Sequence, residues 1–236
     1  MMRSPRRTCL AALTALGMSM GCNLVGEGEG RVASDRLYAI DCWDGAFELR
    51  PDFFAAVPFD DTMQIRIQRG NDLQEFSDGL VLTLDGVSSI RPRACTLDSD
   101  CATGTCGGDG LCLGPDRRGT PVRVGLPGQL AMELAPAEPR EPAPVSLSLF
   151  LNFSCRNKNT TLYAIDGTIT FDQLFSNDPN ERSGSERLTE ARFDVTVADP
   201  RDAPEGTLDV PADRRSRLTG DFSFVFQRGQ PGQPFP

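Results

Sequence analysis

The feature that most constrains this chain is an alternation of apolar and polar residues that returns along most of its length. The clearest case is 145–153, where every second residue is apolar. The pattern recurs at 63–68, 80–84, 193–197 and 222–227. Successive side chains of a β-strand point to opposite faces, so a period of two predicts strands with one buried face.

Shorter runs at 37–43, 120–126 and 168–171 extend this pattern, and Asp-Gly turn signals separate the runs, as at Asp166-Gly167. Helical periodicity is scarce, and a short helical turn is expected only at 52–57. Many short strands with polar turns predict an all-β fold, an antiparallel β-sandwich or barrel-like single domain of roughly eight to ten strands.

Residues 1–21 have the form of an export signal. Three arginines at 3, 6 and 7 precede a mostly apolar run over 9–20, which has the length of a signal-peptide core and is too short to span a bilayer. The end of this segment, Ser-Met-Gly-Cys at 19–22, resembles the lipobox of bacterial lipoproteins, with Gly21 and Cys22 matching and Ser19 in place of the usual Leu. The resemblance implies that Cys22 carries the lipid anchor.

The segment that follows is rich in Gly and Glu, so residues 22–35 are expected to form a flexible spacer after the lipidated cysteine, with the folded domain at 36–236. The protein is expected to be exported and held in the bacterial cell envelope through its N-terminal lipid. Asn23 favours the outer membrane under sorting rules known for some bacteria.

The cysteine count supports export. Of eight cysteines, Cys9 leaves with the signal and Cys22 takes the lipid, and the six that remain predict three disulfides in an oxidising compartment. Cys42 and Cys155 are expected to pair with each other across a loop of about 114 residues, for which the chain-entropy model gives roughly 4.7 kcal/mol. The adjacent Trp43 is most simply a core aromatic packed near this bond.

The other four cysteines lie within 95–112, which has too few apolar side chains for a core of its own and so needs covalent support. The expected pairing is Cys95 with Cys106 and Cys101 with Cys112, although sequence alone allows others. The spacing of the four resembles the short Dickkopf-type Cys-rich modules of exported myxobacterial proteins. That resemblance implies export and disulfides, but it does not imply any particular activity.

Two metal sites are alternatives for this insert. Four thiolates suit zinc, but no CxxC knuckle is present, and exported cysteines are normally oxidised. Asp98, Asp100 and Asp109 could gather around calcium, although aspartates among glycines more often form turns. No metal or other cofactor is therefore predicted.

The absence of histidine excludes large classes of chemistry, including Ser-His-Asp catalysis and His-ligated metals. A net charge of -9 argues against nucleic-acid binding. Tyr38 and Tyr163 lie in the repeated pentapeptide Leu-Tyr-Ala-Ile-Asp and, with Trp43, are the candidate ligand platform. We expect a non-enzymatic binding or structural module with an envelope protein or glycan as partner. The alternative is an envelope hydrolase or its accessory subunit, using carboxylates or a bound cation.

Overall fold

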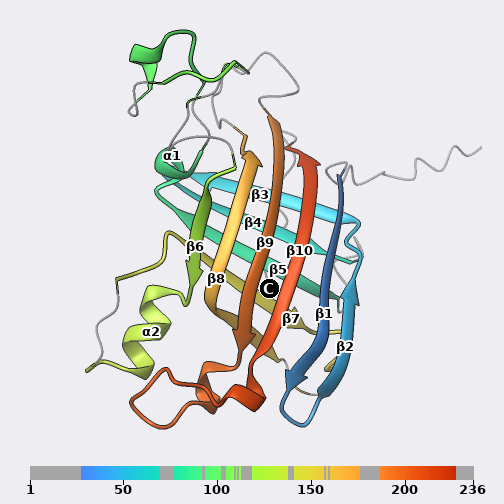
Figure 1. Cartoon of the computed structure of the whole chain (residues 1–236). Coiled ribbons are helices and arrows are strands. Elements are labelled where there is room, and N and C mark those ends of the chain that lie inside the picture. Colours follow the sequence, from blue (N-terminus) through green and yellow to red (C-terminus); the bar gives the residue numbers. More distant parts are fainter. Residues whose placement is uncertain are drawn as a thin grey trace, which may run out of the picture.

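The strands confirm the all-β prediction and form a single curled sheet with few helices (Figure 1). The computed structural model describes residues 28–69, 77–91, 94–101, 105–108, 110, 112, 119–137, 141–156, 158, 160–175 and 187–226. The strands are β1 Gly28–Ala39, β2 Trp43–Leu49, β3 Phe53–Phe59, β4 Thr62–Gln68, β5 Asp78–Asp85, β6 Pro121–Gly125, β7 Val145–Leu151, β8 Thr161–Gln173, β9 Leu188–Ala198 and β10 Ser216–Val225. The helical segments are α1 Val87–Ile90, η1 Asp98–Asp100, α2 Gly128–Leu134, η3 Pro200–Asp202 and η4 Ala212–Arg214.

The sheet runs in the order β2-β1-β10-β9-β8-β6-β7-β5-β4-β3, and all neighbours are antiparallel except the short β6–β7 pair. It folds over itself, so that β2, β1, β10, β9 and β8 form a front half and β7, β5, β4 and β3 form a back half that crosses behind it (Figure 1). Strand β6 lies between the two halves, bonded to β8 on one side and β7 on the other. The edges of the sheet are β2 and β3.

One hydrophobic core fills the space between the halves. Each strand contributes every second residue, as the alternation predicts, and the buried side chains of both halves belong to one cluster. Leu82 and Leu149 of the back half and Val195 and Leu218 of the front half are at most 1% exposed. Residues 145–151 follow the predicted alternation, but Phe153 does not, because the chain turns after Leu151 and leaves Phe153 52% exposed.

The expected spacer at 22–35 is wrong for its second part, because strand β1 begins at Gly28. Residues Gly28–Ala33 pair with β10. A Cβ on Gly28 would lie 2.6 Å from Phe224 Cβ, and one on Gly30 would lie 2.8 Å from the carbonyl oxygen of Asp221. These glycines therefore permit close packing within the sheet, whereas glycine-rich composition suggested flexibility. Residues 22–27, with Cys22, lie outside the described part.

The helical turn expected at 52–57 is also wrong, because this segment forms strand β3. It pairs with β4 along its whole length through a turn at Asp60-Asp61. Pro58 within the strand is compatible with this pairing because β3 is an edge strand with one neighbour.

Asp166-Gly167 does not form the predicted turn. Strand β8 runs through it with an irregularity in its register to β9 between Ala164 and Asp166. Gly167 has a φ of 129°, and a Cβ there would lie 2.5 Å from the carbonyl oxygen of Asp194. The glycine therefore forms part of a β-bulge, the other structure that an isolated glycine in a strand pattern indicates.

The three predicted disulfides are present. Cys42, in the β1–β2 turn of the front half, is bonded to Cys155, just after β7 of the back half, with the two Cα atoms 5.7 Å apart. Cys95 pairs with Cys106 and Cys101 with Cys112, in the interleaved arrangement. The first bond thus links the two halves of the sheet, while the other two lie in the insert between β5 and β6.

Candidate functional site

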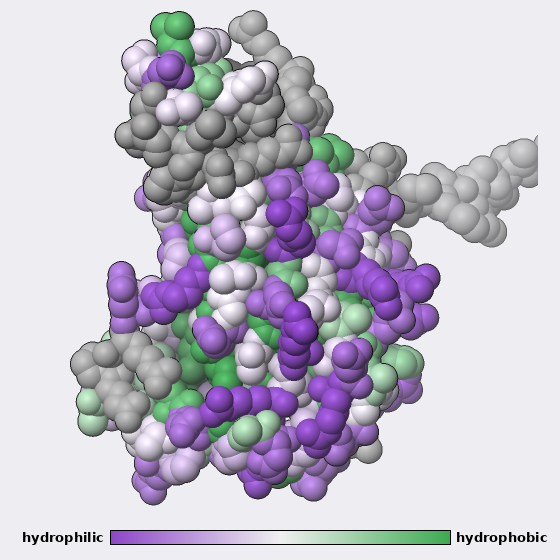
Figure 2. All heavy atoms as spheres, viewed as in Figure 1, coloured by the Kyte–Doolittle hydropathy of each residue, from purple (hydrophilic) through white to green (hydrophobic). Residues whose placement is uncertain are grey.

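A cleft of about 680 Å³ lies beside α2 and is lined by described residues. It lies between α2, strands β6 and β8, and the segment before β10, where Figure 2 shows hydrophobic surface. Its lining mixes apolar and charged side chains, and it includes Arg123, Val124, Leu126, Ala131, Met132, Glu141, Ile165, Asp166, Leu208, Asp209 and Arg215. Mixed linings of this kind are typical of ligand sites.

The bulge in β8 supplies one wall of the cleft. Ile165 is the additional residue between Ala164 and Asp166, which both keep partners on β9. Ile165 and Asp166 line the cleft as a result. Bulges change the direction of a side chain without ending the strand, and they are frequent next to functional sites.

Helix α2 forms the opposite wall. None of its residues is buried, and Met132 is 66% exposed. Helices of seven residues are stabilised mainly by packing an apolar face. The apolar side chains of α2 that line the cleft, Ala131 and Met132, are therefore available to a ligand.

Two arginines fix the rim. Arg123 donates from one Nη2 atom to the carbonyl oxygens of Glu141 and Pro142, each at 3.0 Å, which holds the proline-rich connection against β6. Arg215 bonds the carbonyl oxygen of Val210 and pairs with the Asp209 carboxylate. Both guanidinium groups are thus already engaged by the protein.

Two carboxylates at the cleft, by contrast, have no such partner. Asp166 and Glu141 make no side-chain hydrogen bond or ion pair with any residue that the structure describes. Counted with Asp209, the cleft holds three carboxylates against two guanidinium groups, so its rim carries one net negative charge and attracts positive charge.

The three aromatic residues of the predicted platform do not lie together. Tyr38 is on β1, with the Arg36 guanidinium over its ring at 5.6 Å from the centroid. Arg36 also pairs with Asp44, and this hydrogen bond lowers the pKa of the Asp44 carboxyl. Tyr163 is on β8, opposite Ser148 of β7, and strands β9 and β10 separate it from β1.

Trp43 occupies the position expected of a core aromatic. It packs against the core cluster together with Cys42, and its ring meets Phe47 edge-on at 6.2 Å. Its indole nitrogen donates to the carbonyl oxygen of Gly45 at 3.3 Å. Burial and these contacts leave little of the ring for a ligand.

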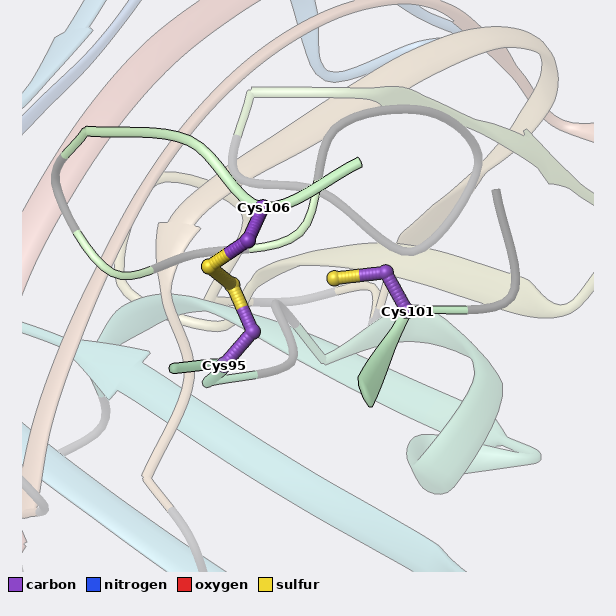
Figure 3. Close-up of side chains that lie close together, drawn as sticks. All are labelled: Cys95, Cys101 and Cys106. Carbon is purple, nitrogen blue, oxygen red and sulfur yellow. A yellow bond between two sulfur atoms is a disulfide. The ribbon is translucent and has the colours of Figure 1, made fainter. Parts of the chain in front are cut away.

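In the insert, the Sγ atoms of Cys95, Cys101 and Cys106 lie within 4.8 Å of one another (Figure 3). Figure 3 shows the Cys95–Cys106 bond, with the Cys101 sulfur pointing toward it. All three sulfurs are in disulfides, whereas zinc binds thiolates. The proximity therefore reflects two adjacent bridges.

The aspartates of the insert support the turn alternative over calcium. Asp98 accepts a hydrogen bond from the Cys106 backbone N–H at 2.7 Å. Asp100 accepts from the backbone N–H groups of Thr96 and Leu97, both at 2.9 Å. These carboxylates bind backbone amides that the disulfide-stapled loop leaves without partners. Asp109 lies outside the described residues.

Comparisons with protein-family models, with curated proteins and with solved structures found no match. Among the described residues, no helix is long and apolar enough to span a membrane. Sequence reasoning did not identify the cleft, because its walls come from β6, β8, α2 and residues 208–215, which are distant in sequence. The one local signal was Asp166-Gly167, which was interpreted as a turn.

Proposed function

We propose that this protein is a lipid-anchored, non-enzymatic binding module of the bacterial cell envelope, with the cleft beside α2 as its ligand site. The observation that carries the proposal is the placement of the cleft relative to the start of β1. Strand β1 begins at one end of the sheet, and α2 lies toward the other (Figure 1). Residues of α2 line the cleft, which therefore lies away from the start of β1.

The chain length between the anchor and the domain supports this orientation. Five residues separate Cys22 from Gly28, and a fully extended chain of that length spans at most about 20 Å. With Cys22 lipidated, the Gly28 end of the sheet is held close to the bilayer. The cleft then faces away from the membrane, where an envelope partner can reach it.

The chemistry of the cleft favours a peptide segment that carries an apolar side chain and a positive charge. Ala131, Met132 and Ile165 offer apolar contact, while Asp166 and Glu141 attract a cation at the rim. The engaged arginines, Arg123 with carbonyl oxygens and Arg215 with Asp209, do not attract an anion to the same degree.

Lipidation is tested by metabolic labelling with a fatty acid in cells that express the full chain. We expect label on the wild type and none on Cys22→Ala, because the acyl chains are attached to that cysteine. Continued labelling of Cys22→Ala would refute the anchor. A Ser19→Leu variant, which restores the usual lipobox residue, should be labelled at least as well as the wild type.

The ligand site is tested with a photoreactive residue in place of Met132. We expect a crosslink to the peptide Leu-Arg-Leu-Arg-Leu-Arg and a much weaker one to its Glu counterpart. Ala131→Trp should weaken the crosslink because the indole occupies the part of the cleft next to Met132, and a photoreactive residue in place of Thr219, on the outer face of β10, is the matched control. Equal crosslinking with and without Ala131→Trp would contradict the assignment.

The hydrolase alternative rests on the carboxylates Asp166, Asp209 and Glu141 in one cleft. If they hold a cation, calcium should raise the melting temperature and EDTA should lower it, because a ligand that binds only the folded state stabilises it. Indifference to both favours the binding module.

A further inference from the structure

The outer face of the back half differs from the rest of the surface in carrying little charge. We call the outward-facing side chains of β4, β5 and β7 the low-charge face. Its members are Thr62, Gln64, Arg66, Gln68, Gly79, Val81, Thr83, Asp85, Ser146, Ser148 and Phe150. Only Arg66 and Asp85 among these eleven are charged, whereas the outward-facing side chains of β9 and β10 in the front half include Glu190, Arg192, Asp194, Arg217 and Asp221.

The low-charge face has a hollow of about 220 Å³ at Gly79. Gly79 lies opposite Gln68 on β4 and Phe150 on β7. A Cβ on Gly79 would come within 2.9 Å of Gln68 Cβ, so only glycine fits this close approach of β4, and the hollow lies above its backbone. The Phe150 ring stands on one side of the hollow, and Gln64 and Arg66 stand on the other.

Most polar groups around the hollow are uncharged. Gln64 and Asn152 have amide side chains, Ser77 has a hydroxyl, and each of these groups can both donate and accept hydrogen bonds without a net charge. Arg66 is the one charged side chain of the lining, and its guanidinium stays protonated and donates only. A ligand that matches this lining presents hydroxyl groups, which pair with amides, hydroxyls and a guanidinium alike.

We propose that the low-charge face binds a neutral polysaccharide, with one sugar ring seated in the hollow at Gly79. A sugar ring has apolar C–H faces, which pack against an aromatic ring, and hydroxyl groups at its edge, which match amides and hydroxyls. The small number of charges on this face favours this ligand over a charged one, since an uncharged polymer gains nothing from the ion-paired front half. The proposal is independent of the cleft and of the lipid anchor.

A second copy of this chain is a weaker fit. Protein interfaces of standard size are enriched in aromatic residues, Met and Arg at their centre. Here the apolar side chains that line the hollow are Val81 and Phe150, and polar groups surround them. Self-association is therefore one outcome that the test must be able to detect.

The test is native electrophoresis of the full chain, solubilised in a mild detergent, through gels containing dextran, glucomannan or hydroxyethylcellulose, which are uncharged, or alginate, which is acidic. We expect at least one neutral polymer to retard the protein. Phe150→Ala should weaken the affinity about tenfold, the factor that corresponds to loss of a central aromatic contact. Gln64→Ala, which changes a polar wall of the hollow, should weaken it in the same gel.

Tyr38→Ala is the matched control, because it removes an aromatic ring from the outer face of the front half and should leave retardation unchanged. Melting curves of each variant establish that it is folded. The proposal is overturned if no neutral gel retards the wild type, if alginate alone does so, or if Tyr38→Ala and Phe150→Ala have equal effects. It is also overturned if light scattering shows a wild-type dimer that Phe150→Ala dissociates.

Discussion

The two outer faces of the curled sheet share one core and yet have opposite surface chemistry. The front half carries cross-strand ion pairs, including Arg217 with Asp194 and Arg192 with Asp172. Figure 2 shows hydrophilic side chains spread over this half. The low-charge face of the back half carries amides, hydroxyls and Phe150 instead. The two faces therefore suit different ligands, and the proposed polysaccharide site lies on the face with fewer charges.

The largest loss of stability is expected from removing the Cys42–Cys155 bond, because this bond joins the two halves of the sheet. Replacing both cysteines with serine should lower the free energy of unfolding by about 4.7 kcal/mol, since a loop of roughly a hundred residues is released in the unfolded chain. Urea unfolding followed by circular dichroism measures the loss.

Replacement of Cys95 and Cys106 with serine is the control for this experiment. That bond closes a loop between residues 11 apart in an insert outside the sheet, and its removal should leave the main unfolding transition close to the wild-type position. If both double-serine variants lost the same free energy of unfolding, the distinct role assigned to the Cys42–Cys155 bond would be contradicted.

Leu149→Ala tests whether the two halves unfold as one unit. Leu149 is fully buried on β7, so its truncation should cost about 3 kcal/mol. Trp43 lies on β2 of the other half, and its fluorescence reports that half. With one shared core, the fluorescence and circular dichroism transitions should shift together.

Ser148→Ala, on the outer side of the same strand, should change stability by less than about 0.5 kcal/mol. If Leu149→Ala moved the circular dichroism transition while leaving the Trp43 transition in place, the halves would be separate units.

Gly167→Ala should have an intermediate effect, because the bulge requires a backbone conformation that alanine rarely adopts. A destabilisation of about 1–3 kcal/mol is expected from the strain, with weakened crosslinking from the cleft because Ile165 moves. Gly206→Ala is a matched control, since Gly206 also has a positive φ of 76° but no atom within 4 Å of a Cβ. A smaller loss for Gly167→Ala than for Gly206→Ala would contradict the role of crowding at the bulge.

The smallest effect concerns the ion pairs of the front half. The hydrogen bond from Arg217 lowers the pKa of the Asp194 carboxyl below its ordinary value of 3.8. The pair therefore contributes stability above about pH 3.8, and this contribution is lost as the pH falls through the lower folded-state pKa. Because the pair is exposed, the contribution is small.

Asp194→Asn should lower the melting temperature by only a degree or two at neutral pH, on the order expected for a surface pair, and the difference from wild type should shrink at pH 3. Glu190→Gln on the same strand is the control, since Glu190 has no ion-pair partner among the described residues. A difference that grew at low pH would have the wrong sign for this linkage.

Alternation was sufficient to predict the fold class, and an even count of oxidised cysteines was sufficient to predict three disulfides. The pairing within 95–112 that the structure shows was one of several that the sequence allowed. Glycine was the main source of error. Gly28 and Gly167 suggested a spacer and a turn, respectively, whereas the structure uses them for close packing and for a bulge. The difference depends on neighbours such as Phe224 and Asp194, which are distant in sequence and which no local pattern identifies.

The proposed ligand surfaces were beyond sequence reasoning for a related reason. The hollow at Gly79 brings together side chains of β4, β5 and β7, and only strand order determines that arrangement. Tyr38 and Tyr163 share a pentapeptide, but sheet order places them on separate strands. A repeated sequence therefore did not indicate a shared site.

The bond between Cys42 and Cys155 also sets an order of events during synthesis. Its partners are 113 residues apart, whereas the insert cysteines pair at a separation of 11. The chain is synthesised from its N-terminus, so Cys42 and the four insert cysteines are present before Cys155. Early oxidation of Cys42 therefore favours wrong bridges to the insert. Correct maturation then requires the insert to close first or a thiol–disulfide isomerase to reshuffle the mistakes, and production in a host that lacks such an enzyme should yield scrambled protein.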